Sequence, residues 1–208
     1  MLPLMIDFSK KKIIIFGGGD VGVRKAAYFS DQADVSVISR SFSSSFDNIR
    51  VARTRADISV AGDEELGRLI TGAFLVIAAT SDPQLNDRIG RICSGQGVLF
   101  NNAEGAKGDV IIPSKIEGNH YLIAISTGGE SPGVSRFLRE HINAMLPNLD
   151  GMIELQGRLR ETLKQREPDQ SRRSRILRDV ILDQDVWRAI AISPEAGWKM
   201  VEMRYLHE

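Results

Sequence analysis

A glycine-rich turn between an apolar run and a helical pattern constrains the fold of this chain more than any other feature. Residues 13–16 are apolar and mostly β-branched, as in a strand buried on both faces. Gly17, Gly19 and Gly22 follow in the pattern G-x-G-x-x-G. Glycines at this spacing allow a tight turn, close approach of backbone to a pyrophosphate, and packing of a helix on the strand. The first amides of that helix favour phosphate groups, so the sequence predicts a dinucleotide site.

Strand-like and helix-like segments alternate from this turn through about residue 101. Such alternation is typical of a parallel sheet with helices on both faces. We expect the later strands at residues 35–38, 49–52, 74–78 and 97–100, and the later helices at residues 63–70 and 83–94. Right-handed crossovers place the carboxyl ends of these strands along one edge, where ligands of such sheets bind. The predicted fold class is therefore α/β, with a Rossmann-like parallel sheet.

The end of the second strand usually indicates which dinucleotide binds. An acid about 20 residues after the glycines holds the ribose hydroxyls of NAD, whereas an arginine accommodates the 2′-phosphate of NADP. Here the sequence is Ser39-Arg40-Ser41, which contains no acid. Arg40 is a candidate phosphate ligand. We expect a nicotinamide cofactor, and this position alone does not choose between NAD and NADP.

The pattern changes after about residue 110. Residues 110–113 and 121–125 resemble two strands joined by a polar turn, which predicts a ribbon appended to the sheet. The loop at residues 126–133 combines hydroxyls, glycines and a Ser-Pro helix start, which favours an anion-binding corner but also fits a capped turn without a ligand. A helix over residues 132–146 and further helices over residues 147–208 are expected.

Composition restricts the classes of partner. The 27 Lys and Arg residues balance the 27 Asp and Glu residues, so no charge excess favours nucleic acid or an anionic membrane surface. The single cysteine, Cys93, excludes an internal disulfide framework, and the three histidines stand at no metal-ligand spacing, so no metal site is expected. The chain has no apolar run near the roughly 20 residues of a membrane helix and no signal peptide pattern. We therefore expect a cytoplasmic protein.

Several separate blocks of the chain carry a resemblance to a known family. They are Gly17-Gly-Gly-Asp-Val-Gly-Val-Arg-Lys25, Leu75-Val-Ile-Ala-Ala-Thr80 with Leu85-Asn86, Asn101, Pro113, and Ala124-Ile-Ser-Thr-Gly-Gly-Glu-Ser-Pro132 followed by Ser135-Arg-Phe-Leu-Arg-Glu140. In order and spacing these blocks resemble the siroheme synthase amino-terminal family, over roughly residues 1–146.

Members of that family are precorrin-2 dehydrogenases, which oxidise precorrin-2 to sirohydrochlorin with NAD, and some also insert ferrous iron to give siroheme. The resemblance implies a tetrapyrrole substrate and NAD as cofactor, with NADP left open. Ferrous or cobaltous ion is a second substrate if the chain is also a chelatase. The family architecture implies a homodimer and three parts, namely a dinucleotide-binding domain at 1–109, a strand-swapped dimerisation region at 110–146 and a helical carboxyl-terminal region at 147–208.

The resemblance also implies site residues. The family's dinucleotide contacts fall on Asp20 and Val21 and on Arg40 and Ser41, and the family too lacks an acid after the second strand, which makes NAD more acceptable. With the glycines and the ends of the fourth and fifth strands, the expected cofactor-binding residues are Gly17, Gly19, Asp20, Val21, Gly22, Arg40, Ser41, Ala79, Thr80 and Asn101. The expected substrate-binding residues are Ser126, Thr127, Gly128 and Arg136, whose guanidinium suits the carboxylates of a tetrapyrrole.

The expected catalytic residue is a carboxylate. The family has an Asp three residues after the Asn that matches Asn101, and this chain has Glu104 there, in a segment shorter than the usual pattern. Dehydrogenation requires loss of a proton from the tetrapyrrole, and metal insertion requires removal of two pyrrole protons, so one carboxylate could serve both reactions. Asp109 is a second candidate, and a solvated loop carboxylate is the alternative role for Glu104.

Two functions of different class remain. The first is an NAD-dependent precorrin-2 dehydrogenase, and the second is a dinucleotide-sensing regulatory module, which also begins with a glycine-turn Rossmann unit. The loop at 126–132 and the helix at 135–140 favour the first. The glutamate at position 104 keeps open a family member repurposed for another tetrapyrrole.

Overall fold

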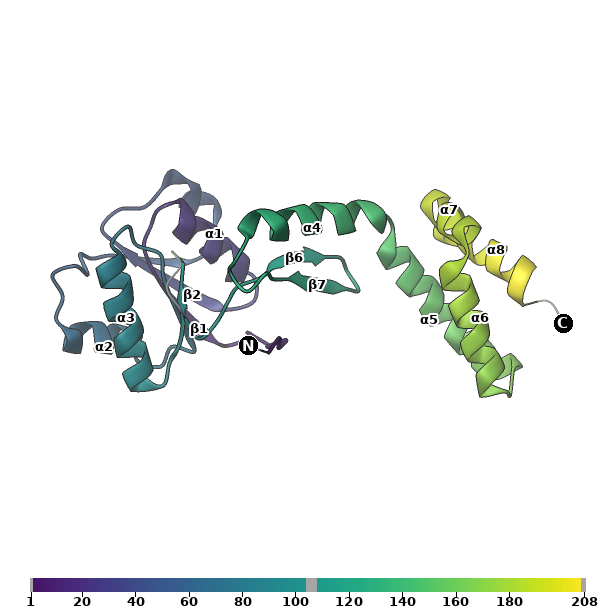
Figure 1. Cartoon of the computed structure of the whole chain (residues 1–208), viewed down its shortest axis with the longest axis horizontal. Helices are drawn as coiled ribbons and strands as arrows, with labels where there is room; N and C mark the ends of the chain where they lie inside the picture. The colour runs from purple at the N-terminus through teal and green to yellow at the C-terminus, as the bar shows by residue number, and fades with distance from the viewer. Residues whose placement is uncertain (1, 104–107, 207–208) are drawn as a thin grey trace. The chain divides into compact units, whose positions relative to one another are not determined.

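The computed structural model describes residues 2–103 and 108–206 (Figure 1). The chain divides into two compact units, residues 1–112 and residues 113–208, which we call the first and the second unit. Each unit is considered by itself below. Within the described residues, no helix has the length and apolar character needed to cross a membrane.

The first unit contains the expected Rossmann-like sheet, with five parallel strands in the order β3-β2-β1-β4-β5. The strands are β1 (Lys12–Phe16), β2 (Asp34–Ser39), β3 (Ala52–Arg55), β4 (Leu75–Ala78) and β5 (Leu99–Asn102). From β1 the chain adds strands first on one side of the sheet, as β2 and β3, and then on the other side, as β4 and β5, so the topological switch point lies between β1 and β4. The carboxyl ends of the strands at such a switch point form the crevice where α/β sheets bind ligands.

Helices cover both faces of this sheet (Figure 1). They are α1 (Asp20–Phe29), the short 3₁₀ helix η1 (Ser44–Asn48), α2 (Asp63–Ile70) and α3 (Pro83–Gln96). Helix α3 begins as its sequence predicts, because the Asp82 side chain accepts hydrogen bonds from the first-turn amides and Pro83 occupies the first helical position. It ends where Gly97 adopts a left-handed φ of 67°.

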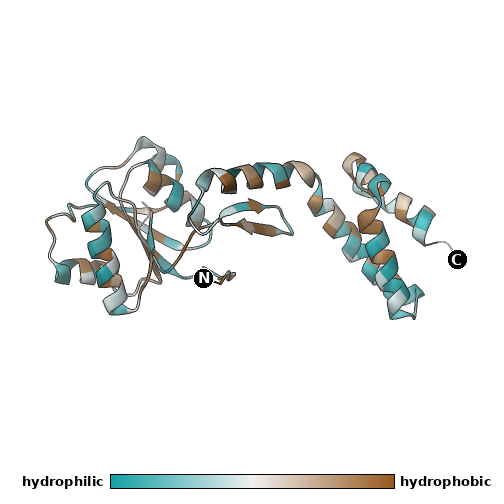
Figure 2. Ribbon diagram, viewed as in Figure 1, coloured by the Kyte–Doolittle hydropathy of each residue, from teal (hydrophilic) through white to brown (hydrophobic). Residues whose placement is uncertain are grey.

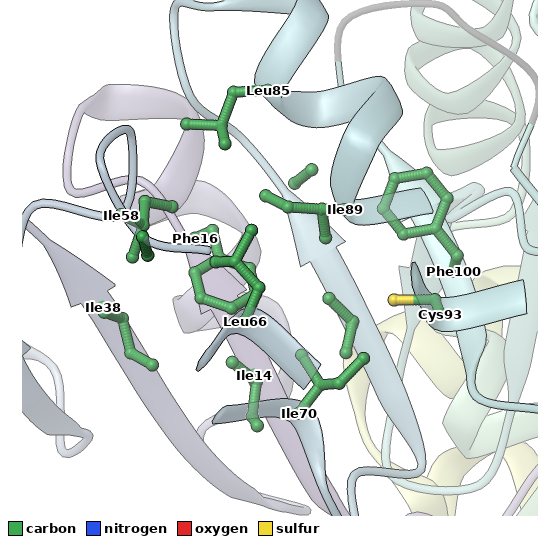
Figure 3. Packing of buried hydrophobic residues seen from close by; sticks show 13 residues of the cluster. Ile14, Phe16, Ile38, Ile58, Leu66, Ile70, Leu85, Ile89, Cys93 and Phe100 are labelled. Atoms are coloured by element: carbon green, nitrogen blue, oxygen red, sulfur yellow. The ribbon is translucent and has the colours of Figure 1, made fainter. Parts of the chain in front are cut away.

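The core has two layers because β1 alternates its side chains between the two faces of the sheet. Ile14 and Phe16 pack with α2 and α3, and Figure 3 shows Leu66 of α2 and Ile89 of α3 among the side chains of this cluster. Ile13 and Ile15 pack on the opposite face, with α1 and η1. A strand buried on both faces is what the uninterrupted apolar run predicted.

Two expected strands are displaced in the structure. The third strand is Ala52–Arg55 rather than residues 49–52, because Ile49 and Val51 pack onto the α1 face of the core before the chain joins the sheet. All four residues of β3 are exposed, so the edge strand carries no apolar signature. Residues 110–113 are not a strand, and the ribbon begins only at Ser114, after a proline that has no N–H to donate.

Over residues 113–206, the second unit contains an antiparallel ribbon and five helices. These are β6 (Ser114–Glu117), β7 (Leu122–Ile125), α4 (Pro132–Met145), α5 (Leu149–Arg166), α6 (Gln170–Leu182), α7 (Gln184–Ile192) and α8 (Pro194–Tyr205). Helices α5 to α8 enclose a core that includes Leu159, Val186 and Val201. Helix α4 buries none of its residues, although apolar residues recur along it in Figure 2.

Candidate functional site

The glycine turn between β1 and α1 is closely packed against its neighbours. Gly17 has a φ of +119°, and a Cβ atom there would lie 2.2 Å from the carbonyl oxygen of Ala79 at the end of β4. A Cβ atom on Gly22 would lie 2.1 Å from the carbonyl oxygen of Gly17, and one on Gly18 would lie 2.1 Å from that of Ser41. These three positions require glycine because backbone occupies the space of a side chain.

Gly19 differs from the other glycines of the turn. It is the N-cap of α1, no side chain caps the helix there, and a Cβ atom would meet nothing within 4 Å. The first-turn amides of a helix have no partner within the helix, and they lie at the positive end of its dipole. The turn therefore presents donors and open space together, which fits the pyrophosphate of a dinucleotide.

A cavity of about 900 Å³ opens at this edge of the sheet. It is lined by the glycine turn, by the residues that follow β2 and β3, and by those that follow β4. Eight predicted cofactor-binding residues line it together: Gly17, Gly19, Asp20, Val21, Arg40, Ser41, Ala79 and Thr80. The volume and the placement at the strand ends are typical of a small-molecule site. The binding roles of these residues stay predictions.

Two predicted cofactor-binding residues lie outside the lining. Gly22 packs against the carbonyl of Gly17 and shapes the turn instead. Asn101 is buried on β5, where its side-chain amide donates a 2.7 Å hydrogen bond to the Val110 carbonyl. Its Oδ1 atom has no hydrogen-bond partner among the described residues.

The loop after β4 is held rigidly at the edge of the cavity. Thr80 Oγ1 donates a 2.6 Å hydrogen bond to Oδ1 of the fully buried Asn86, whose Nδ2 atom donates to the Thr80 carbonyl at 3.0 Å. The Thr80 amide also donates to Asn86 Oδ1, at 3.3 Å. Asn86 thus fixes the backbone on which the β4 side of the cavity is built.

Replacing Asn86 with alanine is therefore expected to lower the free energy of unfolding by about 2 kcal/mol, because the fully buried amide side chain and its three hydrogen bonds to the half-buried Thr80 are lost. Urea unfolding measures the loss. Gln84→Ala, at an exposed position of the same helix, is the matched control. Equal stability of the two variants would show that the network does not support this loop.

The sequence-based reasoning missed several lining residues, among them Phe42, Ser43, Asp57 and Ser59. Asp57 and Ser59 follow β3, and the misplaced third strand moved the expected sheet edge away from them. Asp57 Oδ2 lies 3.8 Å from a guanidinium nitrogen of Arg40. The side-chain and backbone hydrogen bonds from Ser59, with the nearby Arg40, lower the pKa of Asp57.

The predicted substrate-binding residues lie in the second unit: Ser126, Thr127 and Gly128 in the loop between β7 and α4, and Arg136 on α4 itself. Ser126 Oγ accepts a hydrogen bond from the Gly128 amide at 3.1 Å. Thr127 Oγ1 accepts one from the Ser131 amide, also at 3.1 Å. Arg136 pairs with Glu140 one turn along α4 at 2.9 Å, which lowers the pKa of the Glu140 carboxyl. The bonds of Ser126 and Thr127 are those of a capped turn, the Arg136–Glu140 pair lies along α4, and tetrapyrrole contact by these residues stays a prediction.

Glu104, the predicted catalytic residue, lies outside the residues that the structure describes. The second candidate, Asp109, accepts a hydrogen bond from the Phe100 amide at 3.1 Å and so joins the chain to β5. Burial, with Asp109 nearby, raises the pKa of Cys93 to about 12, which leaves this thiol unreactive. Within residues 2–103 and 108–206, no group of three or more His, Cys, Asp or Glu side chains could hold a metal ion.

Comparisons with known proteins agree with the Rossmann-like sheet. A family model described as "Putative NAD(P)-binding" matches residues 4–114. A precorrin-2 dehydrogenase of Methanosarcina barkeri (strain Fusaro / DSM 804) is 43% identical over 199 residues, which cover 93% of this chain and 88% of the relative. A siroheme synthase of Ectopseudomonas mendocina (strain ymp) is 31% identical over 98% of this chain, which spans only 44% of that relative.

The solved structure of SirC, a precorrin-2 dehydrogenase, shares the fold, with a TM-score of 0.70 over 98% of this chain and 100% of that one. Its sequence identity is 20%, so this likeness concerns the fold alone. The sequence match, the family model and the glycine turn together identify the relationship. The chain belongs to the siroheme synthase amino-terminal family, which includes the precorrin-2 dehydrogenases.

Proposed function

We propose that this protein is a precorrin-2 dehydrogenase that oxidises precorrin-2 to sirohydrochlorin with NAD. The observation that carries the proposal is the cavity at the open amino end of α1, in a chain that is 43% identical to a precorrin-2 dehydrogenase over most of its length. A regulatory dinucleotide sensor shares the glycine turn, but the match to that enzyme extends over 93% of this chain and so through the second unit.

The residues of the first unit bind and orient the dinucleotide. The first-turn amides of α1 hold the pyrophosphate, and Gly17 and Gly22 keep the turn close to the sheet. Arg40 and Ser41 line the part of the cavity beyond β2, and Thr80, held by Asn86, lines the part beyond β4. When bound, the oxidised nicotinamide supplies the hydride acceptor.

Oxidation of the tetrapyrrole removes a proton as well as a hydride. We propose that the Glu104 carboxylate accepts that proton, since the resemblance assigns a carboxylate to this position. Ser126, Thr127, Gly128 and Arg136 are proposed to contact the substrate, whose carboxylates suit hydroxyl and guanidinium donors.

An anaerobic assay tests the dehydrogenase directly. Precorrin-2 is supplied with NAD, and the absorbances of NADH and of sirohydrochlorin are followed together. Both are expected to rise in step, since one hydride leaves each substrate molecule. If neither product forms with NAD or with NADP, the dehydrogenase proposal is wrong.

Chelation is proposed as a second activity, because siroheme synthases are among the relatives. Here ferrous or cobaltous ion is a substrate, added to sirohydrochlorin without any dinucleotide. The protein is expected to accelerate metal insertion above the rate without protein. Equal rates would remove the chelatase activity and leave the dehydrogenase proposal intact.

We also propose a homodimer built through β6, β7 and α4. A two-stranded ribbon is marginal by itself, and α4 exposes Val134, Phe137 and Met145. A second copy of this region would cover those side chains. A cytoplasmic location is proposed as well, because a single cysteine that is free and buried fits a reducing compartment.

Phe137→Ser is expected to shift the protein from dimer to monomer in sedimentation experiments, because Phe137 is 62% exposed on a helix that buries nothing of its own. The matched control is Ile192→Ser on α7, which removes an even more exposed apolar side chain outside the proposed interface. A dimer that persists in Phe137→Ser, or a wild-type monomer, would contradict the proposal.

A further inference from the structure

Two opposite charges stand together at the rim of the cavity, one after β2 and one after β3. The parallel register pairs Ser39 with Arg55, and the Ala56 amide extends it with a 3.1 Å hydrogen bond to the Ser39 carbonyl. Arg40 follows β2 and Asp57 follows β3, so these two residues lie side by side at the ends of adjacent strands. A guanidinium nitrogen of Arg40 lies 3.8 Å from Asp57 Oδ2, and both residues line the cavity.

The Asp57 carboxylate is held in one orientation. Its Oδ1 atom accepts the Ser59 amide at 3.0 Å and the Ser59 hydroxyl at 2.5 Å. Its Oδ2 atom is left to face Arg40. The side chain of Asp57 is 41% exposed, so a bound molecule could reach it.

The charges around the cavity do not favour a further anionic group. Among the described residues that line it, Arg40 is the only cation, and the acids are Asp20, Asp57 and Asp82. NADP differs from NAD by a phosphate that carries about −1.5 to −2 charges at neutral pH. Such a group beside Arg40 would also lie beside the Asp57 carboxylate, and like charges placed together reduce affinity.

We propose that Asp57 is the residue that sets the dinucleotide preference of this site, favouring NAD over NADP. Asp57, which follows β3, provides the acid that is absent from the residues after β2. Its negative charge also offsets the positive charge of Arg40. The inference rests on the proposed function in one respect, namely that a nicotinamide dinucleotide occupies this cavity.

Direct binding of NAD and NADP, measured by calorimetry on the full chain, tests this role without any turnover. The wild-type protein is expected to bind NAD at least about 10-fold more tightly than NADP. In Asp57→Asn that preference is expected to fall by about 10-fold or more, mainly through tighter NADP binding. The amide of asparagine can still accept the Ser59 bonds, so the turn is retained.

The control is Asp47→Asn, which removes a comparable exposed acid that pairs with Arg53 at 2.8 Å and lies outside the lining. It is expected to leave the preference unchanged. Arg40→Gln added to Asp57→Asn is expected to reverse the gain in NADP affinity.

Three results would overturn the inference. The first is a wild-type preference for NADP, and the second is an unchanged preference in Asp57→Asn while NAD still binds. The third is a similar change of preference in Asp47→Asn, which would mean that the overall charge of the protein, and not Asp57 itself, sets the preference. If neither dinucleotide binds the wild-type protein, the proposed function itself fails, and that result is distinct from the other three.

Discussion

Replacing Gly17 with alanine is expected to lower the free energy of unfolding by about 3 kcal/mol or more and to abolish dinucleotide binding. Two penalties coincide at this position. An L side chain rarely adopts a φ of +119°, and its Cβ atom would lie 2.2 Å from the Ala79 carbonyl oxygen. That oxygen belongs to the backbone at the end of β4, so relief requires β1 and β4 to move apart at the edge where the cavity opens.

Gly19→Ser is the contrasting variant. The backbone of Gly19 is extended, with a φ of −82°, and a side chain there meets no atom within 4 Å. Serine is a preferred N-cap residue, so the stability of this variant is expected to equal or slightly exceed that of the wild type. Its hydroxyl would accept a hydrogen bond from the same first-turn amides that a pyrophosphate requires, and dinucleotide affinity is expected to fall by at least about 10-fold.

Urea unfolding and calorimetric titration with NAD separate the two effects. Gly17→Ala is expected to lose both stability and NAD binding. Gly19→Ser is expected to lose NAD affinity alone. A Gly19→Ser protein that binds NAD as tightly as the wild type would place the pyrophosphate away from the α1 amides. A Gly17→Ala protein of wild-type stability would contradict the packing of the turn against β4.

The strand-turn-helix unit could be predicted because each of its steps leaves a mark on the sequence. A buried strand must be apolar, and backbone contact at positions 17 and 22 excludes any side chain, so residues 13–22 specify their own structure. The same logic located β4, whose residues are all buried. Where burial restricts a position to apolar residues or to glycine, the secondary structure can be predicted from the sequence.

Asp57 could not be predicted in the same way. It follows an edge strand whose four residues are exposed, so nothing in their character distinguishes strand from loop. The apolar Ile49 and Val51 suggested a strand, but they pack on the core from the preceding loop. A displacement of three residues at β3 was enough to hide the pairing of Arg40 with Asp57, because that pairing depends on register rather than on composition.

Glu104→Gln is expected to reduce kcat for precorrin-2 oxidation by at least about 10-fold, because an amide cannot accept the proton that the tetrapyrrole must lose. Glutamine preserves the length of the side chain and its capacity to accept a hydrogen bond, so NAD affinity and KM are expected to stay near wild-type values. The anaerobic assay measures kcat and KM, and calorimetry measures NAD binding. A lower kcat with unchanged NAD affinity would mean that the variant impairs proton transfer and not cofactor binding.

Two companion variants make the interpretation specific. Glu104→Asp keeps the carboxylate, restores the residue that the family carries, and is expected to retain most of the activity. Glu202→Gln, at an exposed position of α8, removes a carboxylate elsewhere and is expected to change nothing. If Glu104→Gln keeps the wild-type rate, Glu104 is a solvated carboxylate and another base must act. If Glu104→Asp falls as far as Glu104→Gln, the length of the side chain matters as much as its charge, which would mean that the site has adapted to glutamate.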